Sequence, residues 1–341
     1  MRRHAPSRDG HPCHYNHVNP TPRISVPKRR NESDKPEPSS TQAMHDEMMR
    51  DLTRLLGQQE FKSFDEMNAF LQSEVTGKPL RHVQPTTDRE RAEDLVMAAR
   101  QERSLPKLRA QVTKALTLDA DCIAAYLLLA EVAESPAKAL AHCRDAIAAG
   151  DRVLAEFLSD KDAPMWLVPN GRPYLRARHL FAELLWQIGD RPAALEEART
   201  ILRLNAADNQ GIRYILIEWL MRAGSVADID ALLSAYDEST AAWTFTTALH
   251  RYRMLGPTTE STKALRAAIR ANAHVAPMLL GTSPMPDELP DTHGFGDQDE
   301  AAIYVSGSIS TWLDAMGALG WLADVSRPSP GGRTGPKRRL R

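Results

Sequence analysis

Apolar residues recur at three- and four-residue steps along most of this chain, a spacing that places them on one face of a helix. The first such run extends from Met44 to Leu56 and predicts an amphipathic helix. Ser63 stands three residues before Glu66, the spacing of a capping box, and predicts a second helix that ends near Gly77. From about residue 88 onward nearly every segment has helical spacing, so we expect an all-α chain.

Two kinds of marker recur with one period in the second half of the chain. Glycines stand between helical runs at positions 189, 224 and 256, at intervals of 35 and 32 residues. A turn between two helices favours glycine because glycine tolerates positive φ. Ala-Leu pairs at 231–232 and 264–265 are 33 residues apart. The chain therefore repeats a helix-turn-helix unit of about 34 residues.

The segment from Tyr174 to Asn209 carries the clearest copy of this unit. It resembles the tetratricopeptide repeat: Phe181-Ala182 stands where that family has Leu-Gly, and Ala194 where a small residue lets two helices approach. The Trp and Pro that the family often has are replaced by Arg178 and Ala206. The resemblance implies a right-handed α-solenoid of helix pairs.

A narrower resemblance covers roughly residues 51–323. The segments ANAHVAPMLLG and GFGDQDEAAIYVSGSISTWLDAMGALGWL look like a bacterial group of tetratricopeptide proteins. They are also similar to the C-terminal region of the suppressor-of-tumorigenicity-seven family. Neither resemblance implies a biochemical activity, so both bear on fold and extent alone.

These patterns divide the chain into five parts. We expect helical caps around the repeats because a terminal unit has only one neighbour to cover its apolar face. In the second cap, the pattern predicts a long helix from Asp297 to Met316, with Phe295 in the core. The predicted parts are a disordered basic tail at 1–40, an N-terminal helical cap at 41–77, tetratricopeptide-like repeats at 88–285 with an insertion at 150–173, a C-terminal helical cap at 286–323 and a disordered basic tail at 324–341.

Charge is distributed unevenly although the net charge is only −1. Residues 1–40 carry eight Lys and Arg against four acids, and residues 325–341 carry six against none, which leaves −11 for residues 41–324. The cationic tails could contact nucleic-acid phosphates. They lack interleaved aromatic residues and adjoin an acidic body, so we do not expect specific nucleic-acid recognition.

The apolar runs and the cysteines indicate the compartment. No run reaches the roughly 18 residues of a membrane helix, and no apolar stretch follows Met1 as in a secretory signal. Cys122 and Cys143 lie within helical patterns, which favours buried reduced thiols over a disulfide framework. We therefore expect a cytoplasmic protein without membrane contact.

A ligand groove is expected on the concave side of the repeats, which is lined by the first helices of successive units. Two arginines can bind carboxylates bidentately and an exposed tryptophan can act as an anchor, so the groove suits a protein or peptide partner. The alternative is that these residues are ordinary solvated positions of helix faces. The predicted groove residues are Arg176, His179, Glu183, Gln187, Gln210, Arg213, Trp243, Thr246 and His250.

No pattern in the chain predicts catalysis or a cofactor. Phosphate-binding glycine motifs are absent, and the histidines have no Ser or Cys partner at a recognisable spacing. The cluster H-x-C-H-x-x-H at residues 11–17 has no second pair at zinc-finger spacing, so we expect no metal. Asp208 or Asn209 is expected to cap a helix rather than to act in catalysis. The sequence predicts a non-catalytic protein-binding scaffold or adaptor. The alternatives are a nucleic-acid-associated factor that contacts phosphates through the basic tails, and an enzyme whose site has no recognised pattern.

The insertion contains the apolar run from Met165 to Val168 between two prolines, which is too apolar for a bare solvent loop. We expect it to cover an exposed edge of the repeats. The alternative is that Trp166 and Arg172 contribute to the ligand groove.

Overall fold

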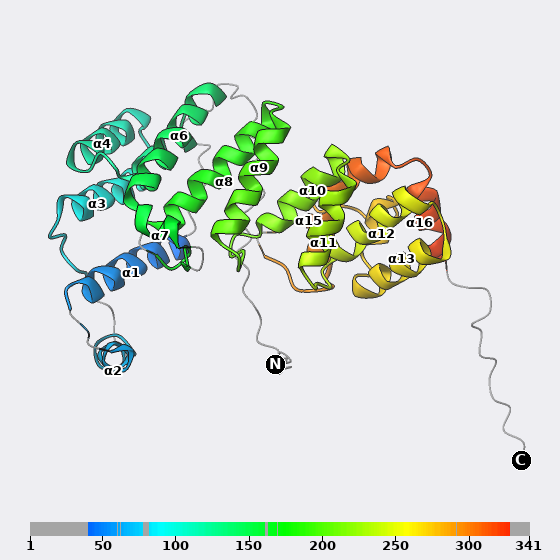
Figure 1. Ribbon diagram of the computed structural model, residues 1–341, viewed down its shortest axis with the longest axis horizontal. Coiled ribbons are helices and arrows are strands. Elements are labelled where there is room, and N and C mark those ends of the chain that lie inside the picture. The colour runs from blue at the N-terminus through cyan, green and yellow to red at the C-terminus, as the bar shows by residue number, and fades with distance from the viewer. Residues whose placement is uncertain are drawn as a thin grey trace, which may run out of the picture. The chain divides into compact units, whose positions relative to one another are not determined.

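The computed structural model describes residues 40–327 except 60, 62, 78–81, 161–162, 169 and 291. Every regular element in this part of the chain is a helix, and sixteen helices are distinguished (Figure 1). The chain divides into two compact units, and the boundary between Glu197 and Ala198 falls within one helix, α9. The described residues up to 197 are called the first unit, and those from 198 the second unit.

Helices of the first unit pack against their neighbours in sequence. α3 packs against α4 and α5 against α6, and α8 then packs against both α5 and α6. Because α3 also contacts α5, the first helices of these pairs touch in succession. The helices are α1 (Ser40–Gly57), α2 (Phe64–Glu74), α3 (Asp88–Gln101), α4 (Leu105–Leu118), α5 (Ile123–Glu131), α6 (Pro136–Val153), α7 (Ala155–Ser159), α8 (Gly171–Gln187) and α9 (Arg191–Leu204), which crosses the boundary.

Polar side chains define where these helices begin. Ser63 Oγ accepts a hydrogen bond from the Glu66 backbone N–H, 3.2 Å away, at the predicted start of α2. At α3, Thr87 Oγ1 accepts from the Glu90 N–H at 3.2 Å, and Glu90 Oε2 accepts from the Thr87 N–H at 2.9 Å. This reciprocal capping box satisfies N–H groups that have no partner inside the helix.

Close approach of α6 and α8 depends on a glycine. The ring of Tyr174 is fully buried, and its hydroxyl donates to Asp151 Oδ1 at 2.6 Å. A Cβ atom on Gly150 would lie 2.1 Å from Tyr174 Cδ2, so the ring occupies the space that any other side chain would need. Gly150 therefore fixes the distance between these two helices.

Helices of the second unit form two pairs and a C-terminal group. α10 packs against α11 and α12 against α13; α15 contacts α10, α12 and α14, and α16 packs on α13. The helices are α10 (Ile212–Ala223), α11 (Val226–Ala235), α12 (Ala241–Leu255), α13 (Thr259–Ala271), α14 (Val275–Leu279), α15 (Gln298–Asp314) and α16 (Ala318–Ser326).

A buried carboxylate joins three segments of the second unit. Glu300 Oε1 accepts from the backbone N–H of Ala241 at the start of α12, 2.8 Å away. Its Oε2 accepts from Asn272 Nδ2 at 2.9 Å, just after α13, and from the Gly296 N–H at 2.7 Å. The start of α15 is thereby pinned between α12 and α13.

The predicted turns between helices are confirmed. Gly189, Gly224 and Gly256 have φ of 89°, 73° and 69°, which places all three in the left-handed region that favours glycine. Gly189 lies between α8 and α9, so the segment with the tetratricopeptide resemblance consists of two helices joined by a turn. Ala182 of α8 and Ala194 of α9 are both buried.

The C-terminal segment differs from the prediction in one respect. α15 begins next to its capping residue, Asp297, as expected, and its fully buried Trp312 belongs to the core. Phe295 is 66% exposed, so the prediction that it packs into the core is wrong. Hydrogen bonds hold the turn before α15, such as Gly294 N–H to Asp297 Oδ2 at 2.6 Å, and its conformation leaves the ring in solvent.

The insertion folds onto the first unit through part of its apolar run. Met165 and Val168 are buried, whereas Leu167 is 73% exposed. The Arg172 guanidinium lies 5.1 Å from the centre of the Trp166 ring, and its Nε donates to the Trp166 carbonyl at 3.2 Å. Part of the apolar run is therefore buried, and the Trp166–Arg172 pair is a contact within the insertion.

No described helix is both long enough and apolar enough to cross a membrane.

Cys122 and Cys143 are free and buried, as expected. Burial raises the pKa of the Cys122 thiol to about 11 and that of the Cys143 thiol to about 12. Both thiols are therefore protonated near neutral pH.

We predict that Gly150→Ala destabilises the protein by about 1–3 kcal/mol, because the new methyl group overlaps the Tyr174 ring. In an open helix position the same change stabilises by up to about 1 kcal/mol. Gly320→Ala in α16 is the matched control, since a Cβ there has no neighbour within 4 Å. Urea unfolding of both variants measures the difference, and a stabilised Gly150→Ala variant would contradict the close approach.

Candidate functional site

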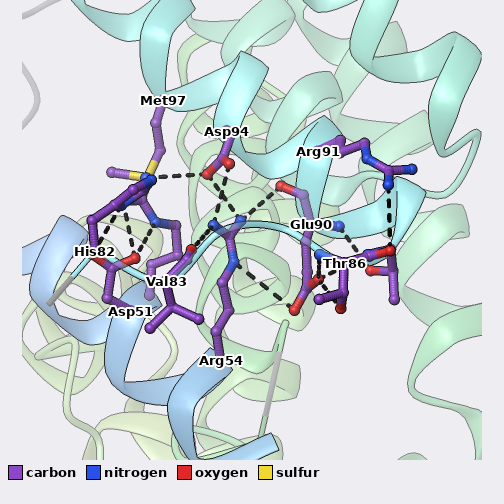
Figure 2. Close-up of polar contacts among 11 residues, drawn as sticks. Asp51, Arg54, His82, Val83, Thr86, Glu90, Arg91, Asp94 and Met97 are labelled. Atoms are coloured by element: carbon purple, nitrogen blue, oxygen red, sulfur yellow. Dashed lines mark hydrogen bonds and ion pairs between the residues drawn. The ribbon is translucent and has the colours of Figure 1, made fainter. Parts of the chain in front are cut away.

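A charged network connects α1 to α3 in the first unit, as Figure 2 shows. The buried guanidinium of Arg54 donates from Nη2 to Asp94 Oδ1 at 2.9 Å and to the Glu90 carbonyl at 2.7 Å. Its Nη1 donates to the Val83 carbonyl at 3.3 Å and to Asp94 Oδ2 at 3.2 Å. One side chain of α1 thus holds both α3 and the segment that precedes it.

A second part of this network surrounds His82. His82 Nδ1 lies 3.2 Å from the buried Asp51 Oδ2 and 3.3 Å from Arg50 Nη2, so two groups compete for one ring nitrogen. Arg50 also reaches Asp94 Oδ1 at 3.2 Å and Met97 Sδ at 3.0 Å. A His–Asp pair can serve acid–base chemistry, but these contacts bind His82 into the ion-pair network between α1 and α3.

Glu90 is held in its ionised form by the capping box. Desolvation acts to raise the pKa of this carboxyl, but hydrogen bonds from the N–H groups of Thr87 and Thr86 and from their hydroxyls outweigh it and lower the pKa to about 2. An acid with so low a pKa is a poor proton donor or acceptor near neutral pH. Glu90 therefore acts here as the carboxylate of the capping box.

Arg213 lies at the centre of a second charged cluster, in the second unit. Its Nη1 donates to Asp208 Oδ2 at 2.7 Å, and its Nε to Glu238 Oε1 at 2.5 Å. Arg213 and Asp208 are both buried. Tyr214 completes the cluster, since its hydroxyl donates to Glu238 Oε2 at 2.5 Å and its ring centre lies 4.5 Å from the guanidinium carbon.

Asp208 also caps α10, as predicted. Its Oδ1 accepts from the Ile212 N–H at 2.7 Å and its Oδ2 from the Arg213 N–H at 3.0 Å. Burial raises the pKa of Asp208, and the hydrogen bonds and charge of Arg213 act in the opposite direction. Burial and the Glu238 hydrogen bond raise the pKa of the Tyr214 hydroxyl, so no nucleophile is activated here. The cluster holds the start of α10 against the segment between α11 and α12.

Trp243 is buried, so the prediction that it is an exposed anchor is wrong. The ring packs edge-on against Tyr214 and Tyr236, with centroids 5.9 Å and 5.7 Å away, and its Nε1 donates to the Tyr236 carbonyl at 3.2 Å. Arg213 is likewise not a surface residue, because its guanidinium is bonded within the Asp208 cluster. Sequence periodicity placed both on a helix face but could not show what covers that face.

The other predicted groove residues of the second unit are also buried. His250 Nε2 lies 2.9 Å from Asp230 Oδ1 of α11. Thr246 is a buried residue of α12. Gln210 is only 5% exposed. Neither the oxygen nor the nitrogen of its side-chain amide has a hydrogen-bond partner among the described residues. None of these three side chains is available on the surface as the prediction required.

The predicted groove residues of the first unit lie on α8, and some of them are accessible. Arg176 and Gln187 are exposed, and Glu183 is partly exposed between them. His179 is buried, with its Nε2 3.5 Å from Glu183 Oε1. At 100° per residue, positions 176, 183 and 187 fall within a narrow arc, so α8 presents one polar stripe. We call Arg176, Glu183 and Gln187 the α8 stripe. These three are the predicted groove residues that are accessible on α8.

No group of three His, Cys, Asp or Glu side chains in the described residues could hold a metal ion. The sequence cluster of His11, Cys13, His14 and His17 lies outside the described residues, as do the basic tails apart from their inner ends. The α1–α3 network was not predicted, although Asp51 and Arg54 stand three residues apart and could have indicated a charged face.

Glu218 of α10 faces α15 at close range. A Cβ atom on Gly307 would lie 2.7 Å from Glu218 Oε2, and Arg222 Nη1 lies 3.7 Å from Glu218 Oε1. Burial raises the pKa of Glu218 to about 7, and the charge of Arg222 only partly opposes this. The protonation of Glu218 therefore changes near neutral pH.

We predict that Arg213→Ala lowers the free energy of unfolding by about 3–5 kcal/mol, because it leaves the buried Asp208 carboxylate without its cation. Arg251→Ala, at an exposed position of α12, is the matched control and should change stability by less than about 0.5 kcal/mol. Urea unfolding followed by circular dichroism compares them. Equal losses would show that the cluster does not stabilise the second unit.

Ionisation of Glu218 should destabilise the folded protein. Its folded-state pKa of about 7 lies above the ordinary value of 4.5, so its contribution is favourable at low pH and is lost as pH rises through about 7. Glu218→Gln should therefore gain stability relative to wild type between about pH 5 and about pH 8. Glu288→Gln, at an exposed position, is the control. A difference from wild type that stays constant over this range would contradict the assignment.

No protein-family model, no curated protein and no solved structure matches this chain. The tetratricopeptide resemblance therefore rests on residues of the chain itself, such as Ala182, Gly189 and Ala194.

Proposed function

We propose that this chain is a non-catalytic, protein-binding scaffold or adaptor built as a right-handed α-solenoid of tetratricopeptide-like repeats. The observation that supports it best is the order of helix contacts in the first unit. Each first helix, α3 and then α5, contacts the first helix of the next pair, and α4 and α6 each contact the pair that follows. Successive packing of this kind is how helical repeats build an extended binding surface.

The α8 stripe is the binding surface of this proposal. Arg176 supplies a guanidinium that can bind a carboxylate or a peptide carbonyl, and Gln187 supplies an amide that can donate and accept. Glu183 lies between them on the same side of α8 and gives the stripe mixed charge. Such a stripe suits an extended peptide, whose backbone offers both donors and acceptors.

A cytoplasmic location belongs to the same proposal, since Cys122 and Cys143 are unpaired thiols that a reducing compartment preserves. A scaffold is preferred to an enzyme because Nη1 and Nη2 of Arg54 and the guanidinium of Arg213 are bonded within the protein. Arg54 Nε is the exception, since it has no hydrogen-bond partner among the described residues. Nucleic-acid binding through the basic tails is the alternative, and it would be lost when both tails are removed.

The test is affinity capture from lysate with the full chain, followed by quantitative mass spectrometry. The double variant Arg176→Ala, Gln187→Ala should lower the affinity for the captured partner by about tenfold or more, because it loses one charged and one neutral hydrogen bond. The matched control changes two exposed residues of a second helix, Lys107→Ala with Lys114→Ala on α4, and should retain the partner. Equal recovery by both variants, at unchanged melting temperatures, would rule out the α8 stripe.

A further inference from the structure

The outward face of α13 in the second unit carries a surface cavity of about 500 Å³. The side chains of Thr259, Thr262, Lys263, Arg266 and Arg270 line it. At 100° per residue these five positions fall within an arc of about 100°, opposite the buried side of the helix. One face of α13 is therefore formed by three cations and two hydroxyl groups.

Several other basic residues of the second unit are paired with acids. Arg199, for example, is bonded to Asp228 at 2.8 Å, and Arg213 to Asp208 at 2.7 Å. Lys263, Arg266 and Arg270 have no acidic partner among the described residues, and all three are exposed. Their charges are therefore available to a partner.

Local helix stability does not explain this arrangement. Like charges three or four residues apart on a helix destabilise it by roughly 0.2–0.5 kcal/mol per pair, and Lys263, Arg266 and Arg270 form two such pairs. Arg270 lies in the last turn, where a cation interacts favourably with the helix dipole. Glu260 stands three residues before Lys263 but forms no ion pair with it, and Arg266 has no acidic residue three or four positions away. Departures from local preference are expected at functional positions.

The wall of the cavity is held in place from the core side. The indole Nε1 of Trp321 in α16 donates to Thr262 Oγ1 at 3.3 Å, and the Trp321 ring stacks on Tyr252 of α12 at 4.6 Å. In Figure 1, α13 lies beside α12 and α16, the two helices that it contacts. A rigid wall lowers the entropy that a partner loses on binding.

We propose that this α13 face is a docking site for a short acidic segment of a partner protein. Charge complementarity identifies the chemistry: three guanidinium or ammonium groups match Asp and Glu side chains, and the threonine hydroxyls can donate to the same carboxylates. The cations span about 10 Å along the helix, which corresponds to only a few residues of peptide. A long polyanion is disfavoured because residues 41–324 carry a net charge of −11.

This inference goes beyond the proposed scaffold function because it concerns a different surface from the α8 stripe. It requires no second ligand on α8. A chain whose Arg176 and Gln187 variants lose nothing in affinity capture could still bind an acidic segment on α13, so the two proposals fail separately.

The experiment is a fluorescence anisotropy titration of the full chain with a short labelled peptide rich in Glu and Asp. Lys263→Gln, Arg266→Gln and Arg270→Gln together should weaken its binding by about tenfold, and added salt should do the same. The matched control makes the same charge change at other exposed cations, with Lys107→Gln, Lys114→Gln and Arg251→Gln, and should bind as wild type does. Thermal melts verify that both variants are folded.

Three results would overturn the proposal. The first is that the wild-type chain shows no salt-sensitive binding of the acidic peptide. The second is that the α13 variant and the control lose affinity equally. The third is that a single-stranded oligonucleotide binds more tightly than the peptide through the same three residues. Conversely, a charge-reversed chain with Lys263→Glu, Arg266→Glu and Arg270→Glu should bind a Lys-rich peptide in place of the acidic one.

Discussion

Close packing of helices across small residues is the constraint on which the rest of this structure depends. Alanines with no exposed surface lie within most of the long helices, and between α6 and α8 the spacing is set by Gly150 against the Tyr174 ring. Protein interiors are close-packed, so a larger side chain at such a contact has no free space to occupy. The helix pairs can therefore touch in sequence order, which brings α3, α5 and α8 into contact within the first unit.

Buried charges then determine how irregular segments attach to this helical core. Arg54 binds the segment before α3, Arg213 binds the segment between α11 and α12, and Glu300 binds the starts of both α12 and α15. Each one bonds backbone or side-chain groups that are distant in sequence. A buried charge is tolerated only when its partners are in place, so these contacts favour one arrangement of the loops over others.

The two surfaces proposed to bind partners are both helix faces. The α8 stripe has mixed polarity, and the α13 face has charge of one sign. Both are regular helix surfaces supported by buried residues, which suits recognition of peptides by side chains held in fixed register.

The sequence by itself determined the all-α class, the turns at Gly189, Gly224 and Gly256 and the cap formed by Asp208, because these depend on local periodicity and backbone preference. Only the tertiary structure decided which face of each helix is covered. Trp243 has the spacing of a surface residue, yet Tyr214 and Tyr236 enclose it, whereas Phe295 is left in solvent. Burial depends on contacts between segments distant in sequence, and periodicity within one helix carries no information about them.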